Sequence, residues 1–307
     1  MDYVTLAAGL PPSSRLGFGS GGVMGRVGRS QSLRAIAAAL DGGITHFDVA
    51  RLYGYGEAEA LVGEALAGKR DRVVIASKFG LAAPRAAGAL RVLKPIAQKL
   101  VASVPGARGV LRSLVGGAAQ APDRFSVASA QTSLEQSLTA LKTDYLDIWF
   151  LHDCAAEDLT DELACFLDSQ IQAGKIRAYG VATSIDATMP LYAARGDAML
   201  YQFPNSIGER NAERLPPGEP RFIAHSPFAG SARIAARLAG AAAGGIHHAM
   251  LAQALAAPNV AVVLCSMLDE AHLRANLDTV ERPRYSAAEI ARFTMLVAEP
   301  MVRAPAA

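Results

Sequence analysis

The sequence predicts an α/β fold, a (β/α)8 TIM barrel, because strand-like and helical segments alternate along most of its length. Eight short apolar runs are separated mostly by segments with helical spacing. Such alternation implies parallel strands joined by crossover helices. Eight units in 307 residues fit closure into a barrel, and no shift in composition marks a boundary. We therefore expect a single domain over residues 1–307.

Each expected strand is a short apolar run, which is typical of the buried strands of a parallel sheet. One of them ends on Lys78, and His152 directly follows another; both side chains can take part in chemistry. In chain order, the expected strands cover residues 15–19, 46–49, 73–78, 145–151, 178–182, 199–202, 222–225 and 260–264.

The expected helices follow from capping signals and apolar spacing. Ser30 is a candidate N-cap for the first helix. Leu134, Leu138 and Leu141 share one face of the third. A helix at about 158–173 opens with acidic residues and closes before Gly174, as the helix dipole favours. The helices are expected at about 31–41, 57–67, 126–141, 158–173, 189–194, 246–256, 269–280 and 287–298.

One segment, at about 79–125, departs from the alternation. Residues 79–122 hold six basic side chains and no acidic one. We interpret the segment as a basic insertion. It is either a solvated surface segment or a flap whose charge attracts an anionic ligand. A basic run with this few aromatic residues is weak evidence for nucleic-acid binding.

Bulk properties exclude several classes of function. A net charge of +2 is too small to suggest nucleic acid or a membrane surface as a partner. No apolar run approaches the roughly 20 residues of a membrane span, and no signal peptide is apparent. Three cysteines without a spaced framework favour a reducing compartment. We expect a cytoplasmic protein, monomeric or a small homo-oligomer, with no metal site.

The candidate catalytic residues lie where strands end. Asp48 ends the second strand, and Tyr53 follows in a turn punctuated by Gly54. Lys78 ends the next strand, and His152 directly follows the one after it. Carboxyl ends of barrel strands are where such folds place their chemistry. A phenol has an unperturbed pKa of about 10, so Tyr53 needs a neighbouring cation to act as an acid.

Three local sequences resemble signatures of the aldo-keto reductase family. Gly43-Ile-Thr-His-Phe-Asp-Val-Ala-Arg-Leu-Tyr-Gly54 is similar to that family's Gly-x-x-x-Phe-Asp-Thr-Ala-x-x-Tyr-Gly. Asp144-Tyr-Leu-Asp-Ile-x-x-x-His152 and Gly174-Lys-Ile-Arg-Ala-Tyr-Gly-Val181 resemble the regions of its fourth and fifth strands. The motifs occur in the family's order over most of the chain.

The resemblance implies an oxidoreductase that interconverts an aldehyde, ketone or sugar lactol with its alcohol, using NADP(H) or NAD(H). Carbonyl reduction needs a hydride, which belongs to the cofactor, and a proton. Tyr53 is the expected general acid, and Lys78 is expected to lower the Tyr53 pKa by stabilising the phenolate. Asp48 holds Lys78, and His152 donates a hydrogen bond to the carbonyl oxygen.

Further positions correspond to the family's cofactor contacts. Gln202 matches the glutamine that binds the nicotinamide carboxamide, and Thr183 replaces a usual Ser-Asn pair. His225 stands where an aromatic residue often stacks on nicotinamide. The first loop, with Ser20 and Gly21, is expected to approach the cofactor closely. The segment after His225 is expected to contact the pyrophosphate, through Ser226, Pro227 and Phe228.

The stretch after the eighth strand departs from the family pattern. Family members often place Lys or Arg there to bind the 2′-phosphate of NADPH. This chain offers Ser266, His272 and Asn276 among its candidate adenosine contacts. A 2′-phosphate without a cation loses charge-assisted hydrogen bonds. NADP preference is therefore doubtful, and we predict NAD(H) use comparable to or better than NADPH.

The sequence allows three other interpretations. Residues 17–22 match G-x-G-x-x-G, but the preceding segment is a poor strand, so a Rossmann site is disfavoured. A cofactor-binding regulatory or redox-sensing subunit with little turnover would keep the same residues. A barrel lyase using Lys78 as a Schiff base is a third reading.

Overall fold

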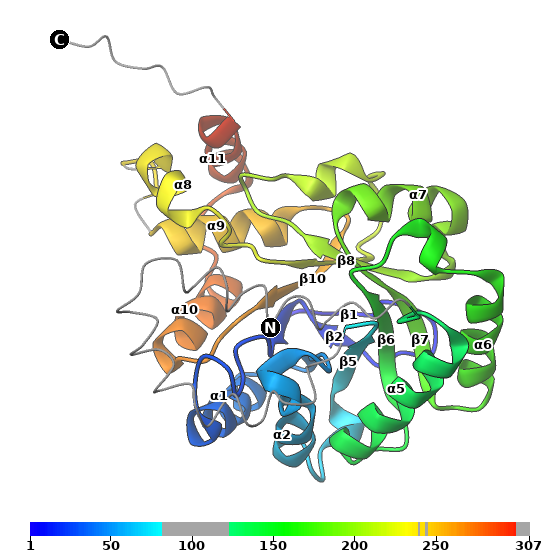
Figure 1. Cartoon of the computed structure of the whole chain (residues 1–307). Coiled ribbons are helices and arrows are strands. Elements are labelled where there is room, and N and C mark those ends of the chain that lie inside the picture. The colour runs from blue at the N-terminus through cyan, green and yellow to red at the C-terminus, as the bar shows by residue number, and fades with distance from the viewer. Residues whose placement is uncertain (82–122, 239, 243–244, 299–307) are drawn as a thin grey trace, which may run out of the picture.

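The computed structural model describes residues 1–81, 123–238, 240–242 and 245–298. Eight parallel strands close into a barrel in the order β10-β3-β4-β5-β6-β7-β8-β9. Helices surround the strands (Figure 1). The predicted (β/α)8 TIM barrel is therefore confirmed. The barrel strands are β3 (Leu16–Gly19), β4 (His46–Asp48), β5 (Val74–Phe79), β6 (Leu146–His152), β7 (Ile176–Ala182), β8 (Leu200–Pro204), β9 (Phe222–His225) and β10 (Val260–Cys265).

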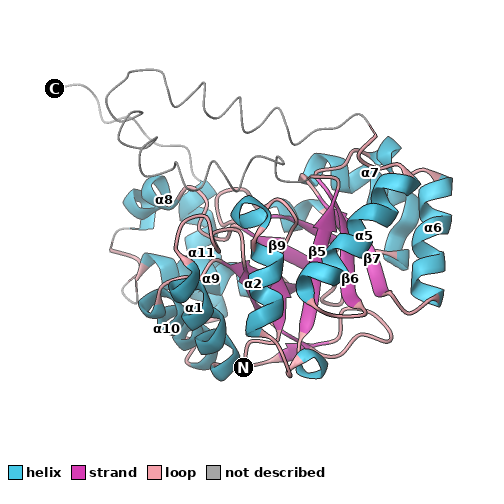
Figure 2. Ribbon diagram, turned by 60° about the horizontal axis from the view of Figure 1, so that its bottom comes forward, coloured by secondary structure: helices cyan, strands magenta, loops and turns pink. Residues whose placement is uncertain are grey.

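The helices pack outside the barrel and alternate with its strands for most of the chain (Figure 2). The α-helices are α1 (Arg29–Asp41), α2 (Ala58–Ala65), α5 (Val127–Leu141), α6 (Asp161–Gln172), α7 (Ile185–Arg195), α8 (Ser231–Leu238), α9 (Ile246–Ala256), α10 (Glu270–Glu281) and α11 (Ala287–Ala298). Short 3-10 turns are η1 (Tyr53–Gly56), η2 (Arg70–Arg72), η3 (Ala156–Asp158), η4 (Gly196–Ala198) and η5 (Asn211–Arg214).

Most expected elements agree with the structure to within a few residues, and one predicted cap is wrong. Helix α1 begins at Arg29, with Gly28 as its N-cap and no side-chain cap bond, so Ser30 lies inside the helix. Ser126 does cap α5, where its side chain accepts a hydrogen bond from the Ser129 amide. The sequence did not predict α8 or the N-terminal hairpin.

The hairpin pairs β1 (Tyr3–Val4) with β2 (Ser13–Ser14) in antiparallel fashion. Leu6 and Leu10, between the two strands, are buried against side chains inside the barrel. Several of those side chains, such as Val74, lie where the barrel strands begin. The hairpin thus covers the amino-terminal end of the barrel and leaves the carboxyl-terminal end for the site.

Strand alternation determines what the barrel interior contains. On β5, Val74 and Ala76 belong to the interior cluster, whereas Ile75 and Phe79 pack in the layer under the helices. Because successive side chains point to opposite faces, the next inward position after Ala76 is Lys78. Apolar side chains therefore fill the lower interior, and a polar side chain follows at the strand's end.

Gly17, in the G-x-G-x-x-G match, lies within β3. A Cβ at this position would come within 2.5 Å of the Leu264 side chain and 3.3 Å of His46. The glycine is needed because neighbouring strands fill the space inside the barrel at that level. The G-x-G-x-x-G match therefore reflects packing inside the barrel and not a Rossmann dinucleotide site.

A buried carboxylate ties three strands together near the amino-terminal end. Both oxygens of Asp147 are bonded: Oδ1 lies 2.7 Å from Arg177, and Oδ2 lies 2.7 Å from Arg70. Oδ2 also accepts a hydrogen bond from the Ile75 amide at 2.8 Å. The guanidinium carbons of the two arginines lie 3.9 and 4.3 Å from the centroid of the Tyr145 ring. This cluster joins β5, β6 and β7.

The predicted basic insertion at about 79–125 lies mostly outside the described residues, at 82–122. Its two flanks are described and meet each other. The Phe79 and Phe125 rings pack edge to face at 5.7 Å, and Phe79 stacks on Trp149 at 4.1 Å. Gly80 has φ +99, and a Cβ there would collide with the Phe125 ring at 2.3 Å. That the whole chain is one domain stays a prediction.

No helix within the described ranges combines the length and the apolar character needed to cross a membrane.

Candidate active site

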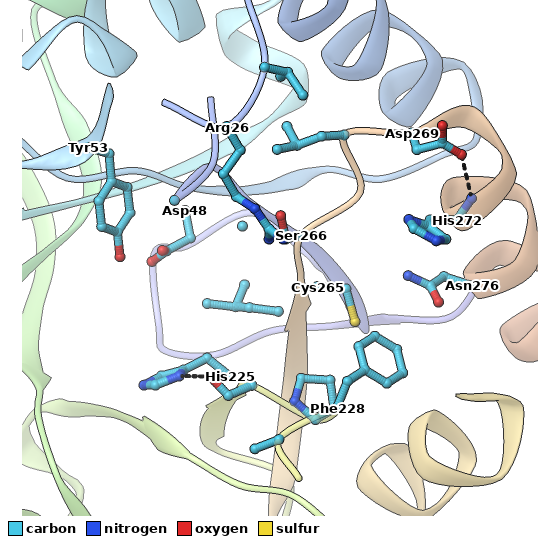
Figure 3. A pocket seen from close by; sticks show the side chains of 18 of the residues that line it. Arg26, Asp48, Tyr53, His225, Phe228, Cys265, Ser266, Asp269, His272 and Asn276 are labelled. Carbon is cyan, nitrogen blue, oxygen red and sulfur yellow. Dashed lines mark hydrogen bonds between the residues drawn. The ribbon is translucent and has the colours of Figure 1, made fainter. Parts of the chain in front are cut away.

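Four of the predicted side chains meet at the carboxyl-terminal end of the barrel. Asp48, Lys78 and His152 end or nearly end β4, β5 and β6, and Tyr53 begins the turn η1. All four line one cavity of about 850 Å3. Figure 3 shows Tyr53 and Asp48 side by side at one end of it. The strand register brings together residues that lie up to a hundred positions apart.

Lys78 and Asp48 form a buried ion pair. The Lys78 ammonium donates to Asp48 Oδ1 at 2.5 Å and to the Val49 carbonyl at 3.1 Å. Both side chains are almost fully excluded from solvent, at 1% and 4% exposure. Burial alone lowers the Lys78 pKa, but attraction by Asp48 and Tyr53 outweighs it, so the pKa is raised. Lys78 therefore keeps its positive charge.

Tyr53 is positioned by a tight turn. Gly54 and Tyr55 both have φ +59, and a Cβ on Gly54 would lie 2.5 Å from the Val23 carbonyl oxygen. This close approach favours glycine after Tyr53. The Tyr53 ring then packs edge-on against His152, with centroids 6.1 Å apart, and its centroid lies 5.2 Å from Lys78 Nζ.

The pKa of Tyr53 differs from the sequence-based expectation. Lys78 lowers it, as expected, but burial of the phenol has the larger effect, and the pKa is raised overall. Removing water disfavours the phenolate more than one shared ammonium favours it, because Lys78 is already paired with Asp48. In this state of the protein Tyr53 is a neutral proton donor.

Two of the histidines that line the cavity, His152 and His225, are uncharged at neutral pH. Burial and the charge of Lys78 lower the pKa of His152 to about 3 and that of His225 to about 4. His225 Nδ1 lies 2.9 Å from the Ser226 hydroxyl. His152 Nδ1 is buried without a hydrogen-bond partner among the described residues. A neutral imidazole can still donate one hydrogen bond.

Most of the predicted cofactor-binding residues share this cavity. They extend from the side chains around Tyr53 towards the start of α10, and Figure 3 shows several of them facing the same space. The predicted residues that line it are Gly21, Gln202, His225, Ser226, Pro227, Phe228, Ser266, His272 and Asn276. The Gln202 carbonyl oxygen is buried and unpartnered within the described part of the chain, so a hydrogen bond is open to a ligand.

Two predicted contacts, Ser20 and Thr183, are not among the lining residues. The Thr183 hydroxyl donates to the Cys154 carbonyl at 2.8 Å, which holds the side chain against the loop after β6. Ser20 is fully buried, and its amide donates to the Asp48 carbonyl at 2.9 Å. Both residues brace the cavity wall in this structure.

Sequence reasoning missed four polar lining residues: Arg26, Gln31, His247 and Asp269. Arg26 lies in the loop between β3 and α1, where no motif marks it. Gln31 donates to the Leu268 carbonyl at 2.9 Å and so joins α1 to the loop after β10. Asp269 gave a usable signal, since an Asp at a predicted helix start suggests an N-cap.

The aldo/keto reductase family model matches residues 15–215, about two thirds of the chain. This chain belongs to the aldo/keto reductase family. The aldo-keto reductase YhdN of Bacillus subtilis is 30% identical over 224 residues, 69% of this chain and 56% of that protein. The chain spans about half the length of the curated relatives it matches.

Solved structures share the family fold. The holo form of aldo-keto reductase AKR11C1 from Bacillus halodurans superposes with a TM-score of 0.75 at 22% identity, covering 96% of both chains. An aldo-keto reductase from Klebsiella pneumoniae in complex with NADPH gives 0.64 at 22% identity, covering 94% and 93%. At these identities the likeness concerns the fold.

Proposed function

We propose that this protein is an NAD(P)(H)-dependent oxidoreductase that interconverts a carbonyl compound and its alcohol. The carbonyl is an aldehyde, a ketone or a sugar lactol, so the enzyme works as a reductase or as an alcohol or aldose dehydrogenase. The observation that carries the proposal is the buried Lys78–Asp48 pair beside Tyr53 at one end of a cavity. Family membership supports the same chemistry.

The cavity fits a nicotinamide dinucleotide. Its volume of about 850 Å3 lies in the range of roughly 300–1,000 Å3 usual for ligand sites. Gln202 offers an unpartnered carbonyl oxygen for an amide, and His225 offers a flat ring nearby. Polar side chains at its other end, His272 and Asn276, suit an adenosine. When bound, the nicotinamide supplies the hydride that no side chain can provide.

Tyr53 is the general acid in this mechanism, giving its hydroxyl proton to the oxygen of the reduced carbonyl. Its raised pKa keeps that proton in place until charge develops on the oxygen. The Lys78 ammonium stays charged and stabilises the phenolate that remains. Asp48 fixes Lys78 through one oxygen. In the oxidation of an alcohol, the proton would pass in the opposite direction, from the alcohol hydroxyl to the Tyr53 phenolate.

His152 orients and polarises the substrate as a neutral hydrogen-bond donor. With a pKa of about 3, it does not carry a positive charge that would compete with Lys78. Its ring packs edge-on against that of Tyr53, and both side chains line the same cavity, where a carbonyl oxygen could meet them. Positioned groups of this kind typically contribute about 10²–10⁴-fold to the rate.

The same charges argue against Lys78 as a Schiff-base nucleophile. An amine must lose its proton to attack a carbonyl, yet the pKa of Lys78 is raised by its partners. The ammonium also spends two hydrogen bonds on Asp48 and Val49. Borohydride in the presence of a carbonyl substrate should therefore leave no adduct on Lys78.

The test is spectrophotometric. Purified protein is mixed with NADH or NADPH and a panel of aldehydes, ketones and sugars, and loss of absorbance of the reduced cofactor is followed. Turnover that disappears in Tyr53→Phe supports the proposal. Tight cofactor binding without redox of any substrate would instead support a regulatory or redox-sensing subunit.

A further inference from the structure

The cavity carries a cation midway along its length and a carboxylate at the end away from Tyr53. Figure 3 shows the Arg26 side chain reaching towards Ser266 between Asp48 and His272, and Asp269 beyond it at the start of α10. Arg26 and Lys78 are the arginine and lysine side chains among the described residues that line this cavity. Asp48 already pairs with Lys78, whereas Asp269, the other carboxylate of the cavity lining, forms no ion pair with the residues that the structure describes.

Asp269 is held in place by the helix that it begins. It is the N-cap of α10, and Oδ1 accepts hydrogen bonds from the amides of Ala271 at 2.8 Å and His272 at 3.4 Å. Those amides could otherwise attract a phosphate to the helix terminus. Within the described residues Oδ2 has no partner, so one oxygen of a fixed carboxylate is left for a ligand at this end.

Arg26 lines the same cavity from the loop between β3 and α1. Its exposed guanidinium forms no ion pair or hydrogen bond with any residue that the structure describes. The stem of its side chain passes over Gly22, where a Cβ would come within 3.0 Å of Arg26 Cδ. An unpaired cation midway along the cavity can meet the bridging phosphates of a dinucleotide whose reactive end lies at Tyr53.

We propose that Asp269 makes the cavity selective for NAD(H) by accepting a hydrogen bond from the adenosine 2′-hydroxyl and repelling a 2′-phosphate. This inference rests on the proposed function, which places the nicotinamide beside Tyr53 and the adenosine beside His272 and Asn276. A hydroxyl donates to a carboxylate, as in dinucleotide folds that use an acid for the same purpose. A phosphate cannot donate, and its charge is repelled.

Arg26 does not offset this repulsion, because it serves the bridging phosphates, which NADH and NADPH share. Its removal is therefore expected to weaken both cofactors by the same factor. The discrimination comes from a repulsive element at one position, which is a common route to specificity.

Direct equilibrium binding tests the inference without relying on turnover. Dissociation constants for NADH and NADPH are measured by fluorescence titration on the wild type and on Asp269→Asn, which keeps a good N-cap while removing the charge. The wild type is expected to bind NADH more tightly. In Asp269→Asn the ratio of the NADPH to the NADH constant should fall by roughly tenfold, since one like-charge contact is lost.

Glu270→Gln is the matched control. It removes the same charge one residue further along, where Glu270 is exposed and paired with Arg274 at 2.9 Å outside the cavity lining. Its ratio should equal that of the wild type. Asp269→Ser is a second variant that also preserves capping, and it should change the ratio in the same direction as Asp269→Asn.

The salt dependence of the ratio of the two dissociation constants distinguishes charge repulsion from a purely structural role of Asp269. A structural role would not make this ratio depend on salt. Because Asp269 is exposed, added KCl should screen the repulsion and improve NADPH binding relative to NADH in the wild type. The same addition should leave the ratio unchanged in Asp269→Asn. Arg26→Ala should weaken both cofactors equally.

Four results would overturn the inference. These are wild-type binding of NADPH at least as tight as NADH, an unchanged ratio in Asp269→Asn, an equal shift in Glu270→Gln, and a selective loss of NADPH in Arg26→Ala. In each case the proposed oxidoreductase function survives, because both cofactors bind. If neither cofactor binds the wild type, the proposed function fails and the inference fails with it.

Discussion

Two buried aspartates, at opposite ends of the barrel, differ in how completely they are bonded. Asp147 near the amino-terminal end has two arginines and a backbone amide on its two oxygens. Asp48 at the carboxyl-terminal end has one lysine on Oδ1, and Oδ2 is buried without a partner among the described residues. The Asp147 site holds strands together, whereas the Asp48 site keeps one carboxylate oxygen free to accept a hydrogen bond.

The largest effect on turnover should come from changing Tyr53, which lies beside the Lys78–Asp48 pair. Tyr53→Phe removes the proton donor and is expected to lower kcat for carbonyl reduction by about 10²–10⁴-fold. Cofactor affinity, measured by fluorescence titration, should change little. Tyr55→Phe is the control, since Tyr55 shares the turn but not the cavity lining. Equal losses in the two variants would contradict the assignment of Tyr53.

Removing each aspartate charge should separate stability from activity. Asp147→Asn leaves two arginines short of a counter-charge and is expected to lower the free energy of unfolding by about 3 kcal/mol. This is the lower end of the usual range, because Arg70 and Arg177 keep partial access to water. Turnover per folded molecule should stay near wild type. Urea unfolding and steady-state kinetics measure the two quantities.

Asp48→Asn is the counterpart of that variant at the other end. It leaves the Lys78 ammonium buried beside a neutral amide, so both stability and turnover should fall. Loss of turnover in folded Asp147→Asn, or intact turnover in Asp48→Asn, would contradict the assignment of a structural role to Asp147 and a role in turnover to Asp48.

The pH dependence of reduction should lack a histidine step. His152 and His225 have pKa values lowered to about 3 and about 4, so both lose their protons below the usual assay range. The raised pKa of Tyr53 keeps the proton donor in its neutral form on the alkaline side. We therefore expect kcat/KM for an uncharged aldehyde to show no inflection from His152 or His225 between about pH 5 and pH 9. An inflection near pH 6.5 that disappears in His152→Gln would show that the histidine is charged during catalysis.

The smallest effect concerns thiols along the cavity. Cys265 lines it, but burial raises the pKa of this thiol, and burial also raises the pKa of Cys154 to about 12. Cys165 is exposed. In the native protein at pH 8, a thiol reagent should modify one cysteine rapidly without loss of turnover. In denaturant it should modify all three. Rapid labelling of Cys265, detected by peptide mapping, would mean that the cavity wall opens.

Much of the fold and half of the site could be predicted because strand ends carry their own signals. Apolar runs such as 73–78 mark both a strand and the side chain that ends it, so Lys78 could be placed from the sequence. The parallel register pairs Asp48 with Ala76 and Lys78 with Phe150, so the ends of β4, β5 and β6 lie at the same end of the barrel. The short motif around Tyr53 contains the glycine that its turn needs.

Loop residues could not be placed in the same way. Arg26 reaches the cavity through a loop with no periodic pattern, and His247 reaches it from the first turn of α9. Thr183 was expected at the cofactor because it occupies a family position, yet its hydroxyl is already used by Cys154. The sequence gives the type of each residue. Whether Arg26, His247 and Thr183 face the cavity depends on the three-dimensional contacts of their side chains, which the sequence does not give.

The contact between Phe125 and the Phe79–Gly80 flank has a consequence for how such barrels diversify. Since the two flanks of 82–122 already touch, the rest of the barrel is insulated from the length of what connects them. For a flexible connection in general, a fourfold change in length alters the free-energy cost of closure by only about 1.2 kcal/mol. A replacement segment that joins the same two flanks should therefore leave the Phe79–Phe125 contact and the barrel framework intact.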